Sequence, residues 1–110
     1  MQIATRQAGD ATILDVEGDI DLYNSPVVRK ALLEALRVKG ARRVIVNLKA
    51  VRYIDSSGVA SLVEALKVSR ELGSRFSLVG LSPAAREVLE LSRLIRVFEV
   101  YESEQQALGA

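Results

Sequence analysis

The chain has 110 residues, of which 49% are apolar and 26% are charged, a balance typical of one globular domain with a sizeable core. Its 15 basic and 14 acidic residues are interspersed, so no global field is available to attract nucleic acid or an anionic membrane. There is no cysteine and no histidine, which excludes disulfides, the usual zinc sites and a Ser-His-Asp triad.

The sequence also shows no pattern typical of a targeting signal. Residues 1–6 lack the apolar core of a signal peptide, and no segment approaches the roughly 20 apolar residues of a membrane span. We therefore expect a cytoplasmic chain that forms a single domain over residues 1–110.

The N-terminal residues predict a β-hairpin. Residues 1–7 alternate weakly between apolar and polar, residues 11–17 form a clearer strand, and residues 8–10 have turn chemistry. We expect these two strands to pair antiparallel. Three acids follow at alternate positions, Glu17, Asp19 and Asp21.

A first helix is predicted to begin at Ser25 and Pro26, with a hydroxyl at the cap and a proline at the first helical position. Its apolar face consists of Val28, Leu32, Ala35 and Leu36. Gly40 is the expected stop.

Residues 43–48 form a nearly continuous β-branched run, which predicts a central strand buried on both faces. A bend follows, and then a second helix that runs to about Leu72 before Gly73. The apolar face of this helix consists of Val59, Leu62, Val63 and Leu66.

The remaining elements are a strand over residues 75–79, a helix starting at Ser82 and Pro83, a strand over 97–101, and a short helix capped by Ser103 and Gln106. The third helix is expected to bury Val88, Leu89 and Leu91. The order is therefore ββαβαβαβα, an α/β fold with about four helices. Helices of crossover length between strands predict a mixed, mostly parallel sheet with right-handed connections.

Asp55-Ser56-Ser57-Gly58, between the central strand and the second helix, has the chemistry of a helix start. Either Asp55 or Ser56 can accept from the first free amides, and the positive end of the helix dipole points at the two hydroxyls. Two interpretations remain open. One is an ordinary N-cap with a glycine for close packing; the other is a site where a phosphate is tolerated and read.

The sequence offers no catalytic apparatus. It has no nucleophile–base pair, no glycine-rich phosphate loop and no metal-ligand cluster, so we expect no enzyme activity, no cofactor and no metal. The aromatic residues Tyr23, Phe76, Phe98 and Tyr101 are expected in or near the core.

Over essentially its whole length, the chain resembles the STAS domain as found in bacterial anti-sigma factor antagonists. The resemblance rests on residues 46–59, which contain Asp55-Ser56-Ser57-Gly58. It is supported by Gly18-Asp19-Ile20-Asp21 before the first helix and by residues 78–83 after the fourth strand.

The resemblance implies a phosphorylation switch. In the family, the serine directly after the aspartate, here Ser56, is phosphorylated by an anti-sigma factor that is also a serine kinase of the GHKL type. The unphosphorylated antagonist binds the anti-sigma factor and frees the sigma factor. Phosphorylation ends this binding, and a metal-dependent serine phosphatase restores it.

The resemblance also implies the roles of neighbouring residues. Asp21 is placed beside Ser56 as a partner or kinase contact, and Asp55 is expected to cap the helix and orient the turn. Ser57 is structural or a minor acceptor. The implied partner-binding set is Asp21, Asp55, Ser56, Ser57 and Gly58. Independently of the resemblance, a monomer is the default expectation.

Two alternatives remain. STAS domains also serve as soluble subunits of lipid-transporting ABC systems and in other STAS-regulated assemblies, although the retained acceptor motif favours signalling. Asp55 also follows a central parallel strand, as the phosphoacceptor of a response-regulator receiver does, and Asp19 and Asp21 could imitate its magnesium-binding pair. No lysine follows Val79, which argues against a receiver.

Overall fold

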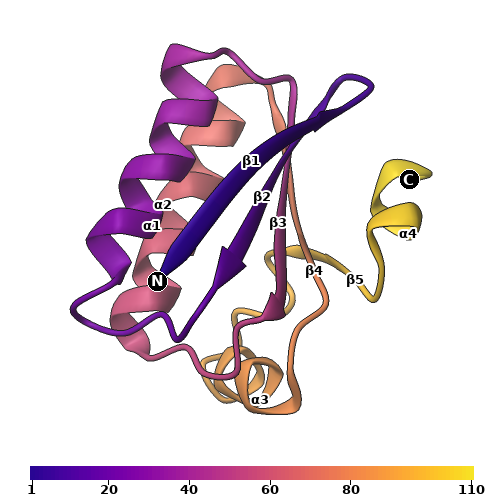
Figure 1. The fold of residues 1–110 in the computed structure, drawn as a ribbon. Helices are drawn as coiled ribbons and strands as arrows, with labels where there is room; N and C mark the ends of the chain where they lie inside the picture. The colour runs from indigo at the N-terminus through magenta and orange to yellow at the C-terminus, as the bar shows by residue number, and fades with distance from the viewer.

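In the computed structural model, which describes all residues 1–110, a five-stranded sheet has helices on both faces (Figure 1). The elements in order are β1 (Gln2–Ala8), β2 (Ala11–Glu17), α1 (Ser25–Leu33), η1 (Glu34–Val38), β3 (Arg43–Ala50), α2 (Ser56–Leu72), β4 (Arg75–Val79), α3 (Pro83–Leu91), β5 (Glu99–Tyr101) and α4 (Glu104–Leu108). The predicted order ββαβαβαβα is confirmed, with the π-helical turn η1 continuing α1.

The strands lie in the order β1-β2-β3-β4-β5. Strand β1 pairs antiparallel with β2, and every other pair is parallel, as predicted. The central strand β3 is buried on both faces: Val44, Ile45 and Val46 are each 0% exposed. This confirms that its continuous apolar run marks a strand covered on both sides.

Two clusters of apolar side chains hold the layers together. Helices α1 and α2 cover one face of the sheet, over a core of 24 buried residues that includes Leu14 and Val46 (Figure 1). The short helix α4 covers the other face, over a cluster of five that includes Ile13 and Ile45. Consecutive strand residues thus face opposite layers, as the period of two requires. None of the helices has the length and apolar character that a membrane crossing requires.

The start of α1 differs from the prediction. The helix begins at Ser25, but its cap residue is Asn24, and Ser25 is buried. The turn before it is closed by Asp21, whose Oδ1 accepts from the amides of Tyr23 at 3.0 Å and Asn24 at 2.9 Å. The prediction of Ser25 as the cap is therefore wrong, because the carboxylate four residues earlier shapes this turn and Ser25 already lies inside the helix.

The third helix also departs from expectation. Leu89 is buried but Leu91 is 77% exposed, so the prediction that Leu91 lines the core is wrong. Side chains two positions apart in a helix point about 200° apart, so Leu91 cannot share a face with Leu89. The last strand is shorter than predicted and starts at Glu99.

The aromatic residues divide into two groups. Phe76 and Phe98 are buried, with ring centroids 6.4 Å apart, and Tyr101 is half-buried, as expected. Tyr23 is 88% exposed, so its predicted place in or near the core is wrong. Tyr23 lies in the turn that Asp21 closes, ahead of the first core residue of α1.

The final helix confirms the first half of its predicted capping box. The hydroxyl of Ser103 accepts from the amide of Gln106 at 3.2 Å. The side chain of Gln106 reaches the amide of Glu102, at 3.0 Å, in place of the amide of Ser103.

Candidate functional site

Asp55 is the N-cap of α2. Its backbone is extended, and its Oδ1 accepts from the amides of Ser57 at 2.9 Å and Gly58 at 3.0 Å. The bond from Gly58, followed by the one from the Ser57 hydroxyl, lowers the pKa of Asp55 below its ordinary value. Of the two candidate caps, the structure therefore selects Asp55 and keeps it ionised at neutral pH.

The two neighbouring hydroxyls have different environments. Ser57 is half-buried, and its Oγ donates to Asp55 Oδ1 at 2.8 Å. Ser56 is the first residue of the helix and is exposed. It is not among the residues that donate hydrogen bonds to the Asp55 side chain. One aspartate thus immobilises the second hydroxyl and leaves the first facing solvent at the positive end of the helix.

Gly58 allows α2 to approach the segment before α1. It is buried, and a Cβ at this position would lie 2.7 Å from Ile54 Cγ2 and 2.8 Å from both Ile20 Cγ2 and the Ile20 carbonyl oxygen. No larger residue fits without moving backbone. The close-packing interpretation of this glycine is confirmed.

Backbone hydrogen bonds bring the Asp21 segment alongside the cap. The amide of Ile20 donates to the carbonyl of Tyr53 at 3.0 Å, and the amide of Asp55 donates to the carbonyl of Ile20 at 3.0 Å. Asp21, which was predicted beside Ser56, therefore lies on a turn that adjoins the Asp55-Ser56 turn. The Asp21 carboxylate accepts from the amides of Tyr23 and Asn24 in the turn before α1, whereas Asp55 accepts mainly from the amides of Ser57 and Gly58 in α2.

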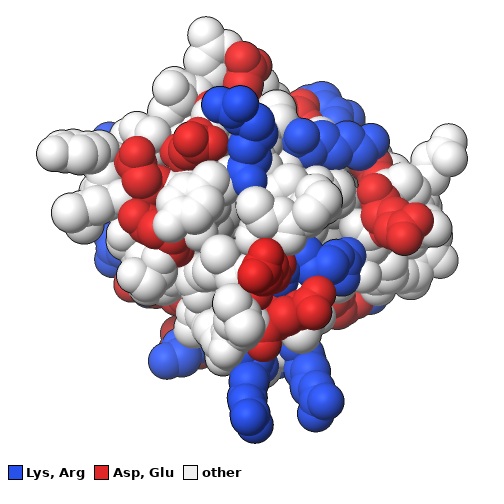
Figure 2. Space-filling model, turned by 90° about the horizontal axis from the view of Figure 1, so that it is seen from below, with Lys and Arg blue, Asp and Glu red and all other residues white.

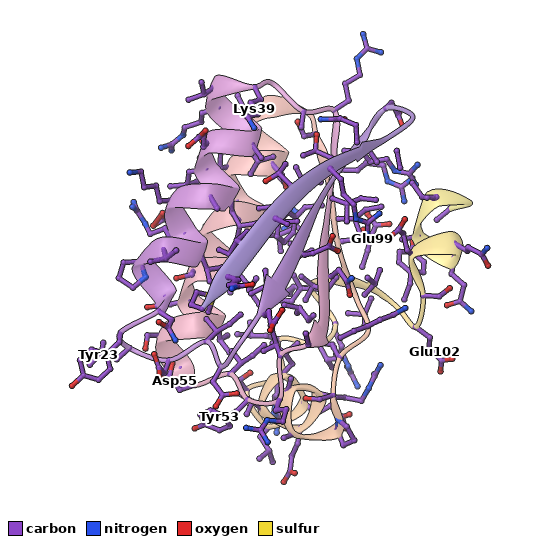
Figure 3. All side chains as sticks on the ribbon, in the orientation of Figure 1. Tyr23, Lys39, Tyr53, Asp55, Glu99 and Glu102 are labelled. Carbon is purple, nitrogen blue, oxygen red and sulfur yellow. The ribbon has the colours of Figure 1, made fainter.

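Several apolar groups are exposed at the same end of the molecule. Leu22 is 70%, Tyr23 88% and Tyr53 48% exposed. Figure 3 shows Tyr23 and Tyr53 projecting outward near Asp55. Figure 2 looks onto this end and shows acidic and basic side chains mixed around uncharged surface.

An open groove of about 700 Å³ begins at Ser56 and runs between α2 and α3. Its apolar lining comprises Val59, Ala60, Val63, Val88 and Leu94. The exposed Ser56 therefore lines this groove and directly follows Asp55, whose amide bonds the segment before the Tyr23 turn.

Comparison with known proteins decides the family. The family model of the STAS domain matches residues 2–107. The chain belongs to the STAS domain family. Among its relatives in this family, a Listeria monocytogenes protein named anti-sigma-B factor antagonist is 34% identical over 94 residues, which cover 86% of this chain and 82% of the relative. A Bordetella bronchiseptica protein named BtrV, a candidate anti-sigma factor antagonist, is 35% identical over 110 residues, covering 100% and 94%.

Solved structures share the STAS fold. A candidate anti-sigma factor antagonist from Thermotoga maritima superposes with a TM-score of 0.91 at 24% identity, covering 97% of this chain and 92% of that one. The Bacillus cell-fate determinant SpoIIAA in its phosphorylated form gives a TM-score of 0.72 at 20% identity, covering 98% and 97%. At these identities the likeness concerns the fold.

The STAS assignment leaves the receiver interpretation without support. Asp21 and Asp55 are directed at separate helix starts, and the structure contains no group of three or more acidic side chains that could hold a metal ion. Sequence reasoning had not placed Tyr23 at this site. The available signal was Asp21, because an aspartate favours a turn in which its carboxylate accepts from the amides that follow it, and Tyr23 is two residues further on.

Proposed function

We propose that this STAS protein is an anti-sigma factor antagonist whose binding to its anti-sigma factor is ended by phosphorylation of Ser56. One observation supports this most directly. Asp55 engages the hydroxyl of Ser57 and leaves that of Ser56 exposed at the N-terminus of α2. Relatives of 34% and 35% identity are named as antagonists or candidate antagonists of anti-sigma factors.

The proposed switch acts through charge at the interface. A phosphoserine carries about −1.5 to −2 charges at neutral pH. The helix N-terminus tolerates such a group, because the dipole there is positive. A partner surface shaped around a neutral hydroxyl would instead meet steric bulk, a desolvation cost and a stronger negative field, to which the carboxylates of Asp21 and Asp55 add.

The proposal implies three partner activities. The anti-sigma factor is a serine kinase of the GHKL type, a metal-dependent serine phosphatase reverses its action, and the sigma factor is released while the antagonist is bound. The chain itself is a monomeric binding module without catalysis. It works in the cytoplasm, where sigma factors meet RNA polymerase.

The test begins with the chain isolated from its own cells. Intact-mass and phosphopeptide analysis should find phosphate on Ser56 that changes between growth conditions. A Ser56→Ala chain should then retain the anti-sigma kinase in the presence of ATP, whereas the wild type loses it.

Ser57→Ala provides the matched control, because it removes the neighbouring hydroxyl and keeps the acceptor. It should lose the kinase in ATP as the wild type does. Phosphate on Ser57 alone, or equal retention by wild type and Ser56→Ala, contradicts the proposal. Recovery of an unmodified chain with membrane transporter subunits would point to the lipid-transport role instead.

A further inference from the structure

Two consecutive apolar side chains stand out from the surface directly before α1. Leu22 is 70% exposed and Tyr23 is 88% exposed. A single exposed apolar residue is common and needs no explanation. This pair adjoins the segment that carries the proposed phosphoacceptor Ser56, and neither side chain belongs to the core.

The backbone under these side chains is fixed by hydrogen bonds. Asp21 Oδ1 accepts from the amides of Tyr23 and Asn24, and the Asp21 carbonyl accepts from the amide of Ser25 at 2.8 Å. The side-chain amide of Asn24 donates to the carbonyl of Asp19 at 2.9 Å. Tyr23 is therefore presented on a preorganised turn, which reduces the entropy lost when a partner binds it.

This turn adjoins the phosphoacceptor. Ile20 is hydrogen-bonded to the backbone of Tyr53 and Asp55, on either side of Ile54, and the backbone of Leu22 also contributes to the low pKa of Asp55. A standard interface buries about 800 Å² per partner, a patch on the order of 30 Å across. The whole molecule measures 30 × 27 × 24 Å, so an interface centred on Ser56 covers the end of the molecule from which Tyr23 projects (Figure 3).

We propose that Tyr23, flanked by Leu22, is the aromatic anchor through which this protein docks on the kinase that phosphorylates Ser56, by inserting its ring into an apolar pocket of that kinase. The proposal rests on the function proposed above. Large aromatic side chains on rigid turns are typical hot spots, since they bury much area at little entropic cost. In this arrangement Asp21 is a positioning residue that acts through Tyr23.

The experiment compares Tyr23→Ala with Val38→Ala. Val38 is a matched control because it is 79% exposed but lies beside Lys39, at the opposite end of the molecule in Figure 3. The probe is the purified kinase that labels Ser56 of the wild-type chain. Tyr23→Ala should raise the Kd for this kinase at least roughly tenfold, and Val38→Ala should change it by less than about twofold.

Steady-state phosphorylation supplies a second measurement. Tyr23 lies outside the chemistry at the hydroxyl, so its loss should raise the KM for the protein substrate and leave kcat close to that of the wild type. Both side chains are exposed, and thermal unfolding should be unchanged. Tyr23→Lys, which keeps a long side chain but carries a charge into an apolar pocket, should bind as weakly as Tyr23→Ala.

The two proposals fail in different ways. If no kinase binds and labels the wild type at Ser56, the proposed function is wrong. If the wild type is bound and labelled but Tyr23→Ala and Tyr23→Lys bind within about fivefold of it, the anchor is wrong and the switch stands. Equal losses in Tyr23→Ala and Val38→Ala overturn the anchor as well.

Discussion

Asp55 distinguishes two serines that are neighbours in the sequence. A carboxylate at the cap has one oxygen aimed at the helix, and here that oxygen takes two amides and the Ser57 hydroxyl. A hydroxyl engaged in this way must break a charge-assisted bond before it reacts. Ser56 has no such bond to Asp55. We therefore expect the cap to make Ser56 the more reactive of the two hydroxyls.

The same cap makes the stability of the protein depend on pH. Because hydrogen bonds lower the folded-state pKa of Asp55, its ionised form is the more stabilising one. That contribution is complete above its unfolded value of about 4 and is lost as the pH falls through the lower folded value. Asp55→Asn keeps a cap acceptor without the charge, so it should be less stable than the wild type by about 0.3–1 kcal/mol at pH 7.

Chemical denaturation of both proteins between pH 7 and pH 3 measures this difference. The wild type and Asp55→Asn share their other carboxylates, whose titrations therefore cancel. The gap should narrow below about pH 4. A gap that stays constant across this range would show that the charge of Asp55 adds nothing to the cap.

Gly58 provides a prediction in which two effects oppose each other. Alanine has a helix propensity about 1 kcal/mol better than that of glycine. At this position its Cβ would lie 2.8 Å from a backbone carbonyl oxygen and equally close to two isoleucine methyl groups. Overpacking of this kind costs about 1–3 kcal/mol, so Gly58→Ala should lower the free energy of unfolding. A more stable variant in denaturant titrations would mean that the Ile20 segment can move aside.

At the residue scale, the sequence predicted the cap motif but could not choose its acceptor. Asp55 and Ser56 both have cap chemistry, and the choice depends on the extended backbone of Asp55. Ser25 was predicted as a cap because Pro26 follows it, yet Asp21, four residues earlier, sets the turn. Local patterns do not reveal which of several nearby acceptors reaches a given amide.

Two arginines hold the short helix α4 by polar contacts. Arg43 donates through Nη1 to the carbonyl of Leu108 at 3.1 Å, and through Nη2 to the carbonyl of Ala107. The Arg43 side chain is only 13% exposed. Arg6 links Asp15 of β2 to Glu104 of α4, but its side chain is 45% exposed.

Burial decides which arginine matters more for α4. Hydrogen bonds from a charged group contribute about 1.5–3 kcal/mol when shielded, and exposed ion pairs contribute little. Arg43→Met should therefore lower the free energy of unfolding by about 2 kcal/mol and speed hydrogen exchange in α4. Arg6→Met should have the smaller effect on both, although it removes two ion pairs; the reverse order would contradict this argument.

Element order and the mixed, mostly parallel pairing of the strands were predictable because hydrophobic period and crossover length act over whole segments. The continuous run of β3 and the spaced face of α2 both took their expected places. Errors arose at the ends of helices, at the start of the last strand and in the turn before α1. Leu91 is the last residue of α3, and the apolar pattern there is too short to show which side of the helix faces the core.

At the scale of the molecule, the pairing of β2 with β3 positions the site. Strand β3 leads into the cap, β2 leads into the Asp21 turn, and the two strands pair in parallel. The two turns follow the carboxyl ends of these strands and therefore lie at the same end of the protein. The Ile20–Ile54 bridge joins the two turns. The site is a consequence of topology, and the residues that form it need no further element to bring them together.

Because strand pairing and the Ile20–Ile54 bridge fix both turns, we expect phosphorylation of Ser56 to change the surface and leave the fold intact. The helix dipole favours an added negative charge by about 0.3–1 kcal/mol, and repulsion from Asp55 opposes it. The free energies of unfolding of the two forms should therefore agree within about 1 kcal/mol.

Hydrogen exchange of the α2 amides, compared between phosphorylated and unmodified protein, is the measurement that decides how the proposed switch operates. Protection through α2 should be the same in both forms. Ser56→Ala incubated with kinase and ATP supplies the control for treatment without modification. Lost protection in the first turns of α2 would mean that the phosphate works by unwinding the helix, because a change confined to surface charge leaves the buried Leu62 and Ala65 face in contact with the sheet.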